Sequence, residues 1–107
     1  MRLYRLVIVL SFLLVSLNVN SQTNEDDINS LSIFSEYVKA KNYDAAYEPW
    51  MELRERNPKF NSAIFVYGER ILKYKIKNSS DEEKINYIND LGNLWNEKRI
   101  NFPNKTP

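Results

Sequence analysis

The segment from Asn42 to Trp50, with Pro58 eight residues further on, constrains the fold of this chain more than any other stretch. Asn42 suits a turn and Asp44 is a favoured N-cap, so we expect a helix that begins at Asp44 and ends before Pro58. Pro49 lies inside this helix and lacks the amide proton that would complete its turn. Because the apolar spacing continues through Pro49, we expect a bend there and no break. The segment predicts a helix-turn-helix unit, typical of a scaffold more than of a catalyst.

Three further segments have the three- and four-residue apolar spacing of amphipathic helices. They cover about 26–41, 61–77 and 80–101; residues 73–77 alternate like a strand, but a lone strand would have no partner. Ser80 and Glu83 form a capping box. With only 2 Gly and 4 Pro in 107 residues, the chain has few loops, so the expected class is all-α. Residues expected to face the core are Ile28, Leu31, Ile33, Phe34, Tyr37, Val38, Ala40, Ala46, Tyr47, Trp50, Leu53, Ile64, Phe65, Gly68, Ile71, Leu72, Ile76, Ile85, Ile88, Leu91, Leu94 and Trp95, and Gly92 is expected to permit close helix approach.

The N-terminus has the three-part layout of a secretory signal peptide: Arg2 and Arg5, an apolar run at 6–17, then a polar stretch. As a helix this run would span about 18 Å, short of the roughly 30 Å hydrocarbon core, so no stable membrane span is expected after cleavage. A buried first helix is the weaker alternative because the run has no polar face. We expect cleavage after Ser21 and export to the periplasm or the cell surface.

The composition excludes several classes of site. The chain has no histidine and no cysteine, which excludes histidine-based catalytic triads, thiolate metal sites and disulfides. The formal charge of +1 becomes −1 once Arg2 and Arg5 leave with the signal peptide, so there is no electrostatic case for nucleic acid. The acids at 81–83 are expected at a helix N-terminus and not in a metal site, and Glu52 and Arg56 are expected to form a solvated ion pair. We therefore expect no enzyme, no cofactor and no metal.

Trp50 and Pro58 are followed 45 residues later by Trp95 and Pro103, which suggests an internal repeat. The chain resembles the tetratricopeptide repeat (TPR) family, whose pattern W-x2-L-G-x2-Y…A-x3-F…P describes two antiparallel helices per unit. The first unit departs from the pattern at 30 and 34, and the second at 91, with a spacing eleven residues longer than the family's. The matching residues are Ile33, Tyr37, Ala46, Trp50 and Pro58 in the first unit, and Tyr67, Gly68 and Ile71 in the second.

The resemblance implies two antiparallel helical hairpins, at 28–58 and 61–103, as a fragment of an α-solenoid. They would follow a signal peptide at 1–21 and a disordered polar start at 22–27. Because one such hairpin cannot bury its own apolar face, about three or more units are normally needed. We therefore expect either the N-terminal part of a longer exported bacterial repeat protein, or an open C-terminal end that docks on a partner or on another copy.

The leading functional hypothesis is an exported, non-catalytic module that binds other proteins, of unknown identity, through its helix faces. The alternative is a small structural subunit of a cell-envelope assembly, with an enzyme as the third possibility. In the resembling family, ligands usually bind the concave face formed by the first helix of each hairpin. The residues that the resemblance assigns to this face are Leu31, Ser35, Lys39, Phe65, Glu69 and Lys73.

Overall fold

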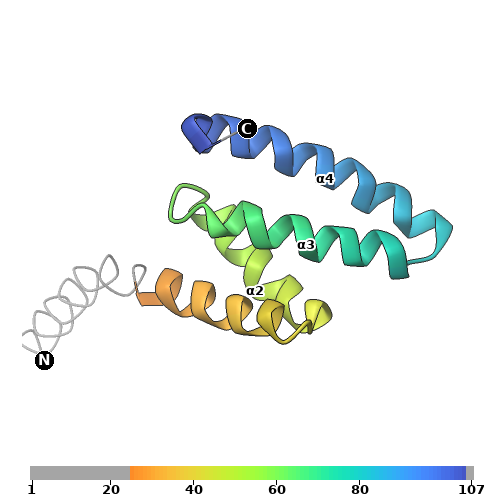
Figure 1. The fold of residues 1–107 in the computed structure, drawn as a ribbon, viewed down its shortest axis with the longest axis horizontal. Coiled ribbons are helices and arrows are strands. Elements are labelled where there is room, and N and C mark those ends of the chain that lie inside the picture. Colours follow the sequence, from red (N-terminus) through yellow and green to blue (C-terminus); the bar gives the residue numbers. More distant parts are fainter. Residues whose placement is uncertain (1–24, 106–107) are drawn as a thin grey trace, which may run out of the picture.

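The structure is a computed structural model that describes residues 25–105, and every regular element in this range is a helix (Figure 1). The first helix covers residues 25–39. It is followed by α2 (Tyr43–Arg56), α3 (Ala63–Asn78), α4 (Asp81–Asn101) and the short 3-10 helix η1 (Pro103–Lys105). The predicted all-α class is confirmed. The predicted signal peptide at 1–21 lies outside the described residues, as do residues 22–24 of the polar start. Residues 25–27, expected to be disordered, belong to the first helix.

The helices are arranged with α3 in the middle (Figure 1). The first helix lies along one side of α3 and α4 along the other, and α2 crosses behind. α2 packs on α3, and α3 packs on α4. The first helix and α4 are therefore the two outer helices of the described range, and each has fewer neighbours than α3.

Local capping sets the helix ends. The first helix ends in a Schellman motif, in which Lys41 adopts a left-handed φ of 60° and the amide of Asn42 donates to the carbonyl of Tyr37 at 2.8 Å. Asn42 then caps α2 by accepting from the amide of Ala45 at 3.4 Å. The expectation that Asp44 is the cap is wrong, because Asn42 already occupies that position and Asp44 falls in the first turn of α2.

The other local predictions are largely confirmed. α2 continues through Pro49 without a break. The alternating stretch at 73–77 is helical within α3. Ser80 caps α4 by accepting from the amide of Glu83 at 3.3 Å, and α4 ends at Asn101 as expected.

Trp50 is the centre of the core. Its side chain is fully buried, and its indole Nε1 donates to the carbonyl oxygen of Ile64 at 2.7 Å. The indole lies directly against Gly68 on α3: a Cβ there would fall 2.6 Å from both Cε2 and Nε1 of Trp50. Glycine at position 68 is therefore what lets α2 approach α3 so closely. The buried apolar core comprises Phe34, Val38, Ala46, Trp50, Leu53, Ile64, Phe65, Ile71, Leu72, Leu91 and Leu94.

Several residues expected in the core are exposed. The outer helices are covered on one side only, so the buried stripe on each is narrower than the sequence suggested. Ala40, in the turn just after the first helix, is also exposed, while Leu31 on that helix is half-buried. The large hydrophobic residues that were expected in the core and are exposed instead are Ile28, Ile33, Tyr37, Ile85, Ile88 and Trp95.

Gly92 does not serve the role expected of it. A Cβ at this position would meet nothing within 4 Å, so no described helix approaches α4 there. Glycine inside a helix costs about 1 kcal/mol relative to alanine because it loses more backbone freedom on folding. Packing within the described residues does not offset this cost.

Replacing glycine by alanine should change the free energy of unfolding in opposite directions at positions 68 and 92. Gly68→Ala forces a methyl group into the Trp50 indole and should lower the free energy of unfolding by about 1–3 kcal/mol. Gly92→Ala adds a methyl group in open space and should raise it by up to about 1 kcal/mol. Urea unfolding of the two variants in dilute solution, followed by circular dichroism, measures both. A change of the same sign for both variants would contradict the assigned packing.

Candidate protein-interaction surfaces

The strongest cluster of charge lies around Arg54, whose side chain is only 6% exposed. Its Nη1 and Nη2 donate to Asp90 at 2.8 and 2.9 Å, and its Nε and Nη2 donate to Glu97 at 3.0 and 2.6 Å. The guanidinium also lies 5.1 Å from the ring centroid of Trp50. Burial lowers the pKa of Arg54, but the hydrogen bonds to Asp90 and Glu97 outweigh it and raise the pKa. These four hydrogen bonds run to α4, while Nη1 also contacts Met51 Sδ on α2 itself at 3.4 Å, so the cluster joins α2 to α4.

A second buried charge, Asp27, ties the first helix to the end of α2. Its side chain is 1% exposed and accepts from Arg56 Nε at 2.6 Å and from Asn57 Nδ2 at 3.1 Å. Arg56 therefore pairs with Asp27 of another helix and not with Glu52, which corrects the predicted ion pair. Burial raises the pKa of Asp27, but the hydrogen bonds from Asn57 and Arg56 outweigh it and the pKa is lowered.

A third ion pair joins α2 to α3. Lys75 Nζ lies 2.7 Å from Asp44 Oδ1, and the hydroxyl of Tyr74 donates to the same carboxylate at 3.3 Å. The hydrogen bond from Lys75 lowers the pKa of Asp44, against a weaker opposing effect of burial. These three networks are explained by helix packing. Among residues 25–105, no group of three or more acidic side chains is placed to hold a metal ion, and no helix is long and apolar enough to cross a membrane.

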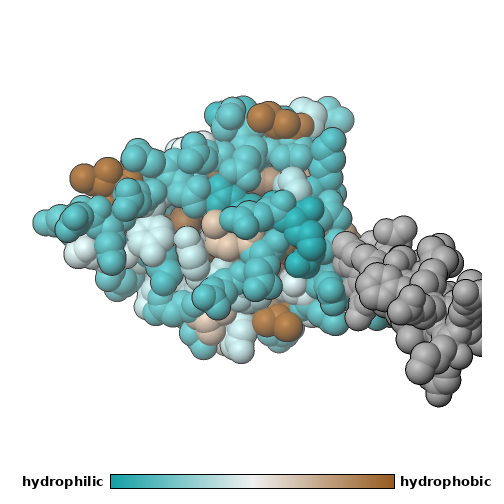
Figure 2. Space-filling view, turned by 180° about the vertical axis from the view of Figure 1, so that it is seen from behind, coloured by the Kyte–Doolittle hydropathy of each residue, from teal (hydrophilic) through white to brown (hydrophobic). Residues whose placement is uncertain are grey.

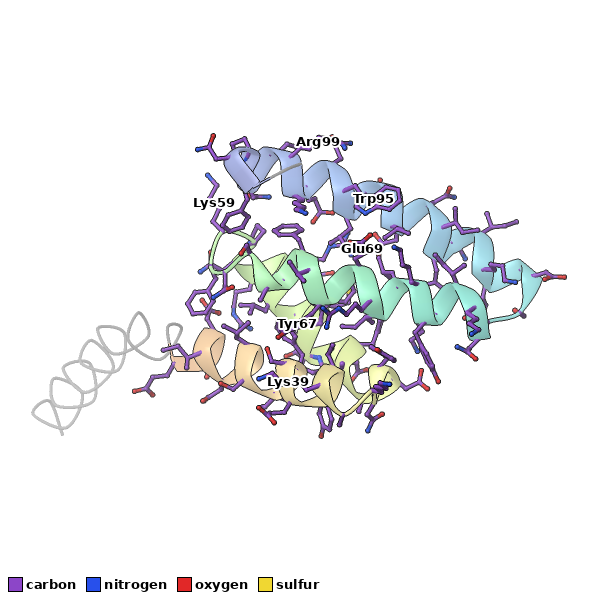
Figure 3. All side chains as sticks on the ribbon, in the orientation of Figure 1. Lys39, Lys59, Tyr67, Glu69, Trp95 and Arg99 are labelled. Atoms are coloured by element: carbon purple, nitrogen blue, oxygen red, sulfur yellow. The ribbon has the colours of Figure 1, made fainter. Side chains whose placement is uncertain are left out.

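The six residues assigned to a concave face do not form one continuous row. Leu31 and Ser35 are half-buried on the first helix, and Lys39 is exposed there, 3.7 Å from Glu36. Tyr67 lies between the first helix and α3, where its ring packs edge-to-face on Phe34 with 6.3 Å between the ring centroids. Glu69 lies on the other side of α3, which faces α4 (Figure 3).

The three assigned residues of α3 have different environments. Phe65 is buried and packs edge-to-face on Phe102 at 5.7 Å, so its ring offers no surface to a partner. Lys73 Nζ lies 3.0 Å from Glu69 Oε1 in an i,i+4 pair. The hydrogen bond from Lys73 lowers the pKa of Glu69, partial burial opposes it, and a side-chain hydrogen bond with Trp95 adds to the lowering. Glu69 and Lys73 thus belong to a surface shared with α4.

Trp95 is the functional candidate that the sequence analysis missed. The apolar spacing of the predicted helix at 80–101 places Trp95 on the core-facing side, and core packing was preferred over a ligand-stacking role. In the structure Trp95 is 43% exposed and lies between α3 and α4 on the face seen in Figure 3. The available signal was the weak separation of apolar and polar sides along α4, since a helix that packs on a core is expected to be apolar on one side only.

A second exposed surface lies on the first helix. Ile33 is 49% exposed and Tyr37 is 39% exposed, one turn apart. Together with Ser32 and Glu36 they line an open pocket whose wall is mainly apolar. We call these four residues the first-helix surface.

Most of the large exposed hydrophobic side chains therefore belong to the two outer helices of the described range. Seen from behind, they stand out at the levels of the first helix and of α4, with a largely hydrophilic surface between them (Figure 2). Exposed apolar side chains that lie next to one another, as Ile33 and Tyr37 do, are a feature of interaction sites. Comparison of the chain with protein-family models, with curated proteins and with solved structures finds no match.

Removing the buried cation tests whether the Arg54 cluster is structural. Arg54→Met keeps an apolar stem but leaves Asp90 and Glu97 without their partner, which should lower the free energy of unfolding by about 3 kcal/mol. Lys39→Met breaks the solvated pair with Glu36 and should change the free energy of unfolding by less than about 0.5 kcal/mol. Urea unfolding at pH 7 measures both, and equal effects would contradict a structural role for Arg54.

The lowered pKa of Asp27 predicts a pH-dependent contribution to stability. A carboxylate with a lowered folded-state pKa contributes fully above its unfolded pKa of about 3.9, and this contribution is lost as the pH falls through the folded-state pKa. Asp27→Asn should therefore be less stable than the parent at pH 7, and the difference should shrink below about pH 4. Urea unfolding between pH 7 and pH 2.5 measures the difference; a difference independent of pH would exclude the ionised Asp27–Arg56 pair as its source.

Proposed function

We propose that this chain is a non-catalytic helical-repeat module that binds other proteins. One observation carries the proposal: within residues 25–105, seven of the eight large exposed hydrophobic side chains lie on the two outer helices. In a stack of helices the outer members are the ones that further repeats or partners cover, because each repeat contacts only its neighbours. The seven are Ile28, Ile33 and Tyr37 on the first helix, and Ile85, Ile88, Trp95 and Ile100 on α4.

The TPR resemblance supports the same function. Two of its matched positions, Ala46 and Trp50, are fully buried, and the glycine matched in the second unit, Gly68, receives the Trp50 indole. We propose that the helices pair as hairpins at 28–58 and 61–103, and that the signal-like N-terminus directs export to the periplasm or the cell surface. The binding partner is a protein, and the binding groups are apolar and aromatic side chains with a polar margin.

A structural subunit of a cell-envelope assembly is the second candidate. The exposure of both outer helices favours it equally, because such surfaces serve as permanent interfaces in an assembly. The two functions differ in what occupies the surfaces: a segment of a different protein in the first case, and a fixed neighbour in the assembly in the second.

The first-helix surface offers a direct test of protein binding. Protein made from the full chain is immobilised and used to select peptides from a phage-displayed random library. Burial of an apolar side chain contributes about 1.5–3 kcal/mol, and about 1.4 kcal/mol corresponds to a tenfold change in affinity. We therefore expect the selected peptides to bind Ile33→Gln/Tyr37→Gln at least about tenfold more weakly than the parent.

The matched control carries two substitutions on exposed positions of α2, Glu52→Gln and Glu55→Gln, and should bind the peptides as the parent does. Circular dichroism checks that both variants remain helical. Failure to enrich any peptide over uncoated support, or equal binding by both double variants, would count against protein recognition by this surface.

A further inference from the structure

α4 has a second row of side chains that are exposed in the described structure, although one of them, Trp95, also forms a hydrogen bond with Glu69 of α3. Its positions are four, three, four, three and four residues apart, the alternation of a coiled-coil seam. At roughly 100° per residue they fall within an arc of about 80° on the helix surface. We call this row the outer seam; it consists of Asp81, Ile85, Ile88, Gly92, Trp95 and Arg99, all of them exposed.

The centre of the outer seam is apolar and contains a gap. Ile85 is 61% exposed and Ile88 is 49% exposed, and both lie one or two turns before Gly92. Because Gly92 has open space above it, the seam has a notch at this point that an apolar side chain from outside can fill. Trp95 borders the notch on its other side.

The ends of the outer seam carry opposite charges. Asp81 opens α4 and lies 4.0 Å from Lys84, at the limit of an ion pair, with its carboxylate fully exposed. Arg99 lies in the last turn, on the side of α4 that faces away from α3 (Figure 3). A helix with this distribution is complementary to a second copy of itself that runs in the opposite direction, which also opposes the two helix dipoles.

The register of such a pair follows from the spacing. Consider the antiparallel register in which the sequence numbers of any two facing residues add up to 180. In this register Ile88 of one copy lies over Gly92 of the second copy and fills its notch. In the same register Ile85 packs against the second copy's Trp95, and Asp81 lies beside the second copy's Arg99. Each contact occurs twice, as a two-fold symmetric interface requires. A parallel pair would instead place each charged end beside an identical one.

We propose that α4 pairs with α4 of a second copy of this chain, in antiparallel orientation, through the outer seam. The inference rests on the proposed function and names the partner of one of its two surfaces. The first-helix surface stays open to other proteins in such a dimer, because it lies on the opposite edge of the described helices (Figure 1).

Sedimentation velocity of protein made from the full chain, over about 1–200 µM, tests the pairing. We expect a monomer–dimer equilibrium. Ile88→Glu places two carboxylates over the two notches and should raise the dissociation constant at least about tenfold. The control, Ile100→Glu, changes the same residue type on the same helix at an exposed position outside the seam, and should leave the dissociation constant nearly unchanged. Circular dichroism shows that each variant is folded.

Exchange of the charged ends tests the direction of pairing. Asp81→Arg and Arg99→Asp should each weaken the dimer, since each puts like charges together, and the double variant should restore it. In a parallel dimer each of these residues would face its own counterpart, so neither single exchange would weaken the dimer. A protein that is monomeric throughout, an Ile88→Glu effect no larger than that of Ile100→Glu, or a double variant that is not restored would each overturn the proposal.

The two proposals fail separately. If the protein is monomeric but selected peptides still bind the first-helix surface, the second copy is excluded and protein binding stands. If selected peptides bind a monomer and lose affinity on Ile88→Glu, the outer seam takes a different protein. A dimer that behaves as expected while no peptide recognises the first-helix surface supports the seam and removes the binding function proposed for that surface.

Discussion

The contact between the Trp50 indole and Gly68 sets the distance between α2 and α3, and the rest of the structure depends on that distance. The indole is satisfied by the Ile64 carbonyl, so its polar atom carries no penalty for being buried. One turn further along α2, Arg54 lies against the same ring and reaches across to α4. A single close approach therefore positions both the apolar core and the buried cation.

α2 is joined by charge to every other long helix of the described range. Asp44 binds Lys75 on α3, Arg54 binds two carboxylates on α4, and Arg56 binds Asp27 on the first helix. Buried ion pairs add little net stability over apolar residues of the same size, but they penalise any arrangement that separates their members. In a domain this small, where the apolar core is limited, such pairs are an effective way of selecting one packing of the helices.

The same arrangement explains where the molecule can interact. α2 and α3 expose one large apolar side chain between them, Val66 of α3, while the first helix and α4 expose several each. The two surfaces differ in kind. The first-helix surface is an open pocket suited to a side chain from a different protein, whereas the outer seam of α4 is complementary to itself. A module with one surface of each kind would present its binding site twice when paired, which increases the effective strength of binding to a repeated or multivalent partner.

Local sequence determined where the helices begin and end. The signals at these ends act within a few residues of chain, so they can be predicted from the sequence alone; they are Ser80 with Glu83, the turn at Asn42 and the stop before Pro58. The cap of α2 was placed two residues too late, at Asp44, because Asp44 and Asn42 are both good capping residues. Which sides of the helices are buried was decided only by the tertiary structure. Trp50 and Trp95 occupy equivalent positions before a proline, yet one is fully buried against a glycine and the other is exposed. The difference is the neighbour: the Trp50 indole fits against Gly68 on α3, whereas Trp95 lies beside Glu69 at the edge between α3 and α4 and stays partly exposed. Burial depends on residues distant in the sequence and not on the helix itself.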